Sequence, residues 1–148
     1  PAWFRYKLGS SRLESLGTSQ PDLHLLQTPH VSVVSWTARD GMKISGYLSR
    51  PSGAGTVKRL PLVVMPHGGP EDRDSLGFDA TVQYLSARGY AVFQPNFRGS
   101  DGFGREFAEL GYREWGGKMQ DDVTDGVLGL IGSGAADPER ICIVGASY

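Results

Sequence analysis

The sequence predicts an α/β fold in which parallel strands alternate with helices. Three short apolar segments, at 62–65, 90–93 and 141–144, are typical of strands buried on both faces. Apolar residues recur at helical spacing in the two intervals between these segments. Strands and helices in this order form a parallel sheet with right-handed crossovers and with helices on both faces. We therefore expect a parallel βαβαβ unit from about residue 60 onward.

Two antiparallel hairpins are expected before this unit. Large apolar residues alternate with basic ones over 3–8, a Gly-Ser-Ser turn follows, and 12–16 indicates a second strand. The polar segment 17–29 is typical of a linker. Residues 31–37 are rich in β-branched side chains, and 43–48 should return antiparallel after an Asp-Gly turn.

The first crossover helix is expected between strands at 61–66 and 90–95. Phe78, Val82 and Leu85 recur there at helical spacing. A glycine follows at the position that favours the end of a helix. The strands on either side of this helix should therefore lie parallel in one sheet.

The second crossover helix is expected over 119–131, where apolar residues lie on one stripe. The carboxylates at 121–122 suit the positive end of the helix dipole, and we expect them on the surface. The Asp-Pro pair at 137–138 should break the chain before a third strand at 140–145. Cys142 lies inside that apolar strand, so we expect a buried core residue.

Composition restricts the classes of function. The chain has 15 Lys and Arg against 16 Asp and Glu, which excludes the broad basic surface of a nucleic-acid-binding protein. No apolar run approaches the ~18 residues of a membrane-spanning helix. The first residues do not form a signal peptide, and we expect a cytoplasmic location. One cysteine excludes a disulfide and a cysteine-based zinc site, and we expect neither metal nor cofactor.

The loops at the C-terminal ends of the three strands should form the functional rim, because ligands bind there in open parallel sheets. These loops are 67–70, 96–102 and 145–148, and they contain five of the 21 glycines. The glycine-rich segment 96–104 lacks the spacing of a phosphate-binding loop. We interpret it as a rim loop in which Arg98 makes buried ion pairs or bonds to carbonyl groups.

The last rim loop indicates a nucleophile. The segment 145–148, Gly-Ala-Ser-Tyr, supplies four of the five positions of a Gly-x-Ser-x-Gly nucleophile elbow. An ordinary loop exit or the first turn of a dinucleotide-binding loop would also fit this tetrapeptide. His-Gly-Gly-Pro at 67–70 favours the elbow, because such a core directs a backbone N–H at an oxyanion. Ser147 is the expected nucleophile, with the N–H of Tyr148 as one oxyanion donor.

His67 is not expected to act as the base. The chain order His67, Asp121, Ser147 matches chymotrypsin-type proteases, but that order belongs to a β-barrel scaffold. In α/β hydrolases the order is serine, acid, histidine. All three histidines precede Ser147, so this sequence cannot complete a triad. We expect the imidazole of His67 to bond its own backbone.

Taken together, these residues resemble the catalytic domain of the prolyl oligopeptidase family of serine peptidases, over about 31–148. The subtype is most similar to the acylaminoacyl-peptidase and dipeptidyl-peptidase branch. The resemblance implies a peptide or acyl-peptide substrate, an acyl-enzyme on Ser147, and oxyanion amides from Gly69 and Tyr148. The matching segments are 67–70, 87–90, 96–104, 115–122 and 137–140 leading into 145–148.

The resemblance also implies a domain organisation. Members of this family place a β-propeller before the hydrolase domain. Residues 3–16 therefore resemble the last propeller hairpin. The stretch from there to about Gly55 resembles a connecting segment. Residues 1–20 would then be a propeller remnant with its linker. Residues 21–148 would be the first half of an α/β-hydrolase fold, truncated at the elbow and lacking the triad Asp and His.

Several consequences follow from this organisation. The 148-residue piece alone is expected to be inactive, and either to form a homo-oligomer or to associate with the rest of the enzyme. No nucleic acid or membrane partner is expected. Two other classes stay open: a non-peptidase α/β hydrolase such as an esterase, which shares the elbow, and a non-catalytic module for nucleotide binding or association.

Overall fold

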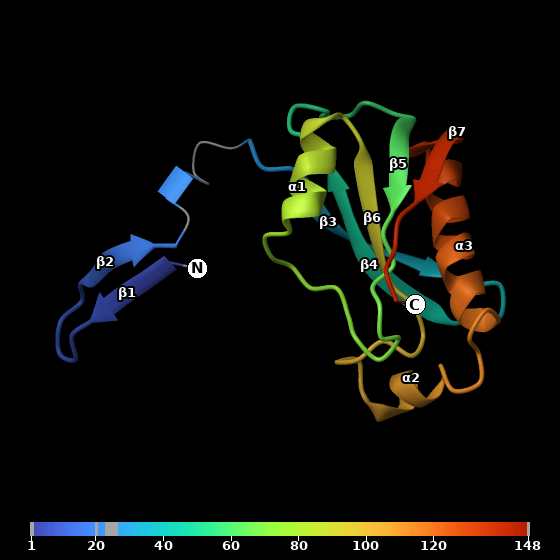
Figure 1. Cartoon of the computed structure of the whole chain (residues 1–148), viewed down its shortest axis with the longest axis horizontal. Coiled ribbons are helices and arrows are strands. Elements are labelled where there is room, and N and C mark those ends of the chain that lie inside the picture. The colour runs from blue at the N-terminus through green and yellow to red at the C-terminus, as the bar shows by residue number, and fades with distance from the viewer. Residues whose placement is uncertain (1, 20, 23–26, 148) are drawn as a thin grey trace.

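The computed structural model describes residues 2–19, 21–22 and 27–147. Figure 1 shows a small hairpin of β1 and β2 standing apart from an α/β unit that contains the other elements. The elements in chain order are β1 (Ala2–Tyr6), β2 (Leu13–Thr18), β3 (His30–Thr37), β4 (Lys43–Arg50), β5 (Leu60–Val64), α1 (Ala80–Ala87), β6 (Ala91–Asn96), α2 (Arg105–Glu109), α3 (Lys118–Gly132) and β7 (Ala136–Ile143).

Five strands form one mixed sheet in the order β3-β4-β6-β5-β7. β5 pairs in parallel with β6 on one side and with β7 on the other, which confirms the expected βαβαβ unit. β4 pairs antiparallel with β6, with Ser45 opposite Asn96. The β3–β4 hairpin therefore extends the same sheet.

The two long helices cover opposite faces of the sheet. Leu62 and Val64 of β5 belong to a hydrophobic cluster with residues of α3. Side chains alternate along a strand, so Val63 and its neighbour Val92 point to the other face. α1 packs over β6 and β4 on that face and buries Val82 there. The central strands β5 and β6 are thus enclosed on both sides, as their apolar sequences indicated, whereas β7, which was expected to be buried in the same way, is mostly exposed.

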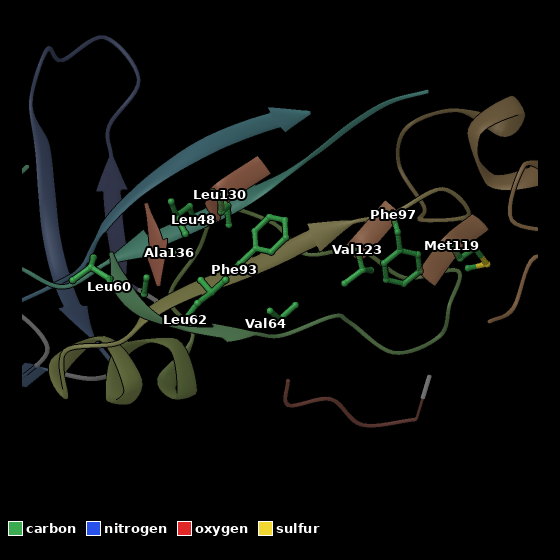
Figure 2. Close-up of a cluster of buried hydrophobic side chains, with 11 residues drawn as sticks. Leu48, Leu60, Leu62, Val64, Phe93, Phe97, Met119, Val123, Leu130 and Ala136 are labelled. Carbon is green, nitrogen blue, oxygen red and sulfur yellow. The ribbon is translucent and has the colours of Figure 1, made fainter. Parts of the chain in front are cut away.

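The main core lies between the sheet and α3 (Figure 2). Phe93 is fully buried there, and its ring meets Trp36 of β3 edge-on at 5.3 Å between centroids. Gly126 of α3 lies against both rings, because a Cβ at this position would be 2.8 Å from Phe93 Cζ. The Trp36 indole donates a hydrogen bond of 2.9 Å to the carbonyl oxygen of Asp122. Close approach of α3 to the sheet therefore depends on a glycine.

β7 departs most from expectation. It begins before the predicted 140–145 and runs through Pro138, which was expected to break the chain. A proline is tolerated there because β7 is an outermost strand of the described sheet, and the pairing with β5 shifts register along its length. The same edge position leaves Cys142 exposed, so its assignment to the core is wrong.

The N-terminal hairpin is antiparallel, with Arg5 and Glu14 joined across it by a salt bridge of 2.6 Å. Its residues are exposed along both strands, including the large side chains of Trp3 and Phe4. Its origin in a β-propeller stays a prediction. The short helix α2 was not expected, because five residues carry too little periodicity to be recognised.

Within the described ranges, none of the helices combines the length and the apolar character that crossing a bilayer requires. The same residues contain no group of three or more His, Cys, Asp or Glu side chains able to hold a metal ion.

Candidate active site

The three rim loops lie together beyond the C-terminal ends of β5, β6 and β7. Figure 1 shows this end of the sheet at the bottom of the view, beside α2. A backbone hydrogen bond links the second loop to the segment that follows the first, since the Asp101 N–H donates to the carbonyl oxygen of Asp72 at 2.9 Å. The sheet therefore assembles the rim that the loop positions predicted.

Ser147 adopts a backbone conformation that serine rarely takes. Its φ is 75°, in the left-handed region, where a non-glycine residue stores about 1–3 kcal/mol of strain. A nucleophile elbow is a strained turn of this kind directly after a strand. Tyr148, the predicted second oxyanion donor, lies outside the described residues.

Gly68 packs directly against this serine. A Cβ at Gly68 would lie 2.8 Å from the carbonyl oxygen of Ala146 and 3.1 Å from Ser147 Cβ. Only a residue without a side chain permits this approach. The structure thus brings the predicted nucleophile and the predicted oxyanion loop into contact.

Gly69 needs to be glycine for two reasons. Its φ is 120°, and a Cβ there would lie 2.8 Å from the backbone nitrogen of Glu71 and 2.9 Å from that of Asp72. Its own N–H donates to no acceptor among residues 2–19, 21–22 and 27–147. A backbone donor beside the serine is therefore left for a ligand atom.

His67 makes the local contact that was expected of it. Its Nδ1 lies 2.9 Å from the carbonyl oxygen of Gly68, the next residue in the chain. Its Nε2 lies 2.8 Å from Ser100 Oγ, and its ring stacks on Phe97 with 4.5 Å between centroids and 14° between planes. Both ring nitrogens are thus engaged within the rim.

The residues that mimic a chymotrypsin triad in chain order do not form one. Asp121 forms a salt bridge of 2.8 Å with Arg39, on the outside of α3. His67 contacts Gly68 and Ser100 through its two ring nitrogens. The rejection of this trio as a triad is therefore confirmed by the contacts of its members.

Three polar side chains that sequence reasoning missed anchor the segment that follows the predicted oxyanion loop. Asn96 Oδ1 accepts from Asp74 N–H at 2.8 Å, and Asn96 Nδ2 donates to the Asp74 carbonyl oxygen at 3.1 Å. Gln94 Nε2 donates to Asp74 Oδ1 at 2.9 Å, while burial raises the pKa of the Asp74 carboxyl. Gln94 and Asn96 are polar residues within an apolar strand, and that anomaly was the available signal.

Arg98 fixes the second rim loop to neighbouring elements through ion pairs. Its guanidinium lies 2.7 Å from a carboxylate oxygen of Asp122 and 2.7 Å from one of Asp40. The expected buried ion pair of Arg98 is confirmed, but Asp122 is fully buried and its placement on the surface is wrong. Hydrogen bonds from Arg98 hold the pKa of Asp40 well below its usual range. The loop is thereby tied to α3 and to the β3–β4 turn.

Comparison with known proteins gives a consistent family assignment. Residues 76–148 match the profile of the prolyl oligopeptidase family. The chain is 36% identical over 152 residues to dipeptidyl aminopeptidase BIII of Pseudoxanthomonas mexicana, covering 99% of this chain and 22% of that protein. It is 31% identical over 159 residues to the acylamino-acid-releasing enzyme of Arabidopsis thaliana, covering 100% of this chain and 20% of that protein.

Solved structures agree with these relatives. The acylaminoacyl peptidase of Pyrococcus horikoshii superposes with a TM-score of 0.80 at 25% identity, over 94% of this chain and 22% of that one. A puromycin-hydrolysing peptidase of Mycobacterium tuberculosis gives a TM-score of 0.80 at 28% identity, over 96% and 22%. The chain thus spans about a fifth of the length of these relatives.

Proposed function

The chain belongs to the prolyl oligopeptidase family, and from this premise we propose that it carries the nucleophile of a serine peptidase. The substrate is a short peptide or an acyl-peptide, as the names of the dipeptidyl and acylamino-acid-releasing relatives suggest. The single observation that carries the proposal is the contact between Gly68 and Ser147, with the serine held at a left-handed φ.

The reaction is acyl transfer through a covalent intermediate. Ser147 Oγ attacks the substrate carbonyl carbon while a base takes the hydroxyl proton, and the carbonyl electron pair moves onto oxygen. Collapse of this intermediate expels the amine, which receives the proton, and leaves an acyl-enzyme. Water then attacks the ester carbonyl carbon, the bond to Oγ breaks, the acyl group leaves as a carboxylic acid, and Ser147 regains its hydrogen.

The developing oxyanion needs hydrogen-bond donors. The unpaired N–H of Gly69 is the donor that the described residues offer, and the N–H of Tyr148 is the proposed second. Loss of one such donor typically lowers turnover by about 10²–10³-fold. This difference is large enough to test residue by residue.

We propose that the base lies outside this sequence. No histidine follows Ser147, and both nitrogens of His67 are engaged elsewhere. A serine hydroxyl is a weak nucleophile without an adjacent base. The 148-residue chain by itself should therefore show no serine-dependent turnover, and serine-dependent hydrolysis by the isolated chain would overturn this part of the proposal.

The test uses the natural full-length protein, a fluorophosphonate probe and a series of peptide p-nitroanilides. Ser147→Ala should abolish labelling and lower turnover by about 10⁶-fold, as in other serine hydrolases. Ser52→Ala changes an exposed serine of a distant loop and should leave both unchanged. Undiminished labelling of the Ser147→Ala protein would refute the assignment.

The same assay separates the other functional classes. Hydrolysis of p-nitrophenyl esters without hydrolysis of peptide anilides would identify an esterase instead of a peptidase. Absence of both labelling and turnover in the wild-type protein would favour a non-catalytic module. A mass-spectrometric search for the labelled peptide places the modification on Ser147 or elsewhere.

A further inference from the structure

We propose that His67 and Ser100 are positioning residues that fix the peptide between Gly68 and Gly69, and so aim the Gly69 N–H. Neither side chain touches the reacting atoms in this arrangement. The inference rests on the proposed role of Ser147, and it adds a function for the imidazole other than that of a base. Three features of the rim carry it.

The first feature is the direction of one carbonyl group. A trans peptide is planar, so the C=O of Gly68 and the N–H of Gly69 point in opposite directions. The carbonyl oxygen is held by His67 Nδ1 at 2.9 Å. The N–H of Gly69 is therefore turned away from the imidazole, and no described residue accepts its hydrogen. Reversal of this peptide would replace a donor with a carbonyl oxygen, which repels an oxyanion.

The second feature is that the imidazole is held at both of its nitrogens. A carbonyl oxygen only accepts, so His67 Nδ1 must carry a hydrogen. Its Nε2 lies 2.8 Å from Ser100 Oγ. Ser100 is fully buried, and its hydroxyl donates a hydrogen bond of 2.6 Å to the carbonyl oxygen of Phe97. The contact at Nε2 is therefore anchored to the backbone of the second rim loop.

The third feature is the rigidity of the support. The imidazole stacks on Phe97, which is fully buried. Ser100 follows Arg98, whose buried guanidinium is bonded to Asp122 of α3. A continuous series of contacts thus runs from α3 through the rim loop to the carbonyl of Gly68. The orientation of the oxyanion peptide is set by the packed part of the fold.

A pair of substitutions at one position isolates the hydrogen bond. In His67→Asn the amide nitrogen stands the same number of bonds from Cα as Nδ1 and can donate to Gly68. In His67→Leu a methyl group of similar shape stands there and cannot. Both variants lose the stacked ring and the contact with Ser100, so only the donor differs between them.

The measurements are kcat and KM of the full-length protein on a peptide p-nitroanilide. His67→Asn should keep kcat within about tenfold of wild type, and His67→Leu should lose about 10²–10³-fold, as for removal of an oxyanion donor. KM should change little, because the oxyanion forms only in the transition state. Ser100→Ala should lower kcat by removing the contact that holds the ring at Nε2, and it should add little in the His67→Leu background, where no ring remains.

The outcomes separate this inference from the proposed function. If the wild-type protein neither turns over nor labels at Ser147, the proposed function fails whatever the variants do. If the wild type is active but the Asn and Leu variants lose kcat equally, or raise KM alone, the positioning role is overturned. Near-UV circular dichroism checks folding, and if His67→Leu fails to fold, an unchanged kcat in Ser100→Ala overturns the inference instead.

Discussion

Gly68→Ala introduces one methyl group at the contact between the proposed oxyanion loop and the proposed nucleophile. The added carbon would lie 2.8 Å from the Ala146 carbonyl oxygen and 3.1 Å from Ser147 Cβ. Carbon atoms normally approach to about 3.5–4.0 Å, so the loop or the elbow must move by roughly half an ångström. Catalytic groups have to be held within about 0.5 Å of their productive positions. The displacement therefore reaches the limit that the site tolerates.

The size of the effect follows from this displacement. A misplacement of about 1 Å can cost 10²-fold in rate, so we expect kcat/KM to fall by about 10- to 100-fold. The clash itself should destabilise the fold by about 1–3 kcal/mol at most, as for other overpacked sites. Activity should thus fall much further than the fraction of folded protein.

Gly77→Ala is the matched control. It makes the same chemical change in the segment between β5 and α1, where a Cβ would meet no atom within 4 Å. Its φ is not in the left-handed region, so the backbone accepts a side chain. Steady-state kinetics on a peptide p-nitroanilide and thermal unfolding of both variants complete the assay. Equal kcat/KM values for Gly68→Ala and Gly77→Ala would refute the reasoning.

The remaining predictions concern stability and are measured by urea unfolding. Asp122→Asn breaks a buried ion pair and should cost about 3–5 kcal/mol, whereas Asp121→Asn removes an exposed pair worth about 0–1 kcal/mol. Gly126→Ala should cost about 1–3 kcal/mol by overpacking against the rings below it, whereas Gly132→Ala enters open space and should be neutral or slightly stabilising. Hydrogen bonds from Arg39 lower the pKa of the Asp125 carboxyl in the folded state. The ionised carboxylate therefore contributes its full stabilisation above the unfolded pKa of about 3.9. That contribution is lost as the pH falls through the lowered folded-state pKa. Asp125→Asn should weaken the acid dependence between pH 5 and pH 2, and an unchanged dependence would contradict the assigned cause.

The apolar pattern predicted the parallel unit well, because buried strands and a helix stripe are local properties of the sequence. It could not tell a central strand from an edge strand. Cys142 and Pro138 were misjudged for that reason, since both lie in β7 at the edge of the described sheet. The antiparallel attachment of β4 to β6 was likewise invisible, because strand pairing is decided by tertiary packing.

The sequence alone was enough to propose an elbow and an oxyanion loop, because each is a short contiguous motif. Their supports were not, because they join residues that are far apart in the chain. Asp74 and Asn96 are 22 positions apart and meet only after the first crossover is complete. Asp121 and Asp122 are neighbours in the sequence, but only Asp122 lies on the buried stripe of α3 with Met119 and Val123, where it meets Arg98.

The guanidinium of Arg98 also constrains the order in which parts of the chain can fold during synthesis. Asp40 leaves the ribosome first, Arg98 follows, and Asp122 emerges last. A cation on its way into the interior is costly until both carboxylates are in place. We therefore expect the loop that carries Ser100 to close only after α3 has formed behind it. In the nascent chain, the rim loop beside the proposed nucleophile would then remain unfolded until α3 has packed against the sheet.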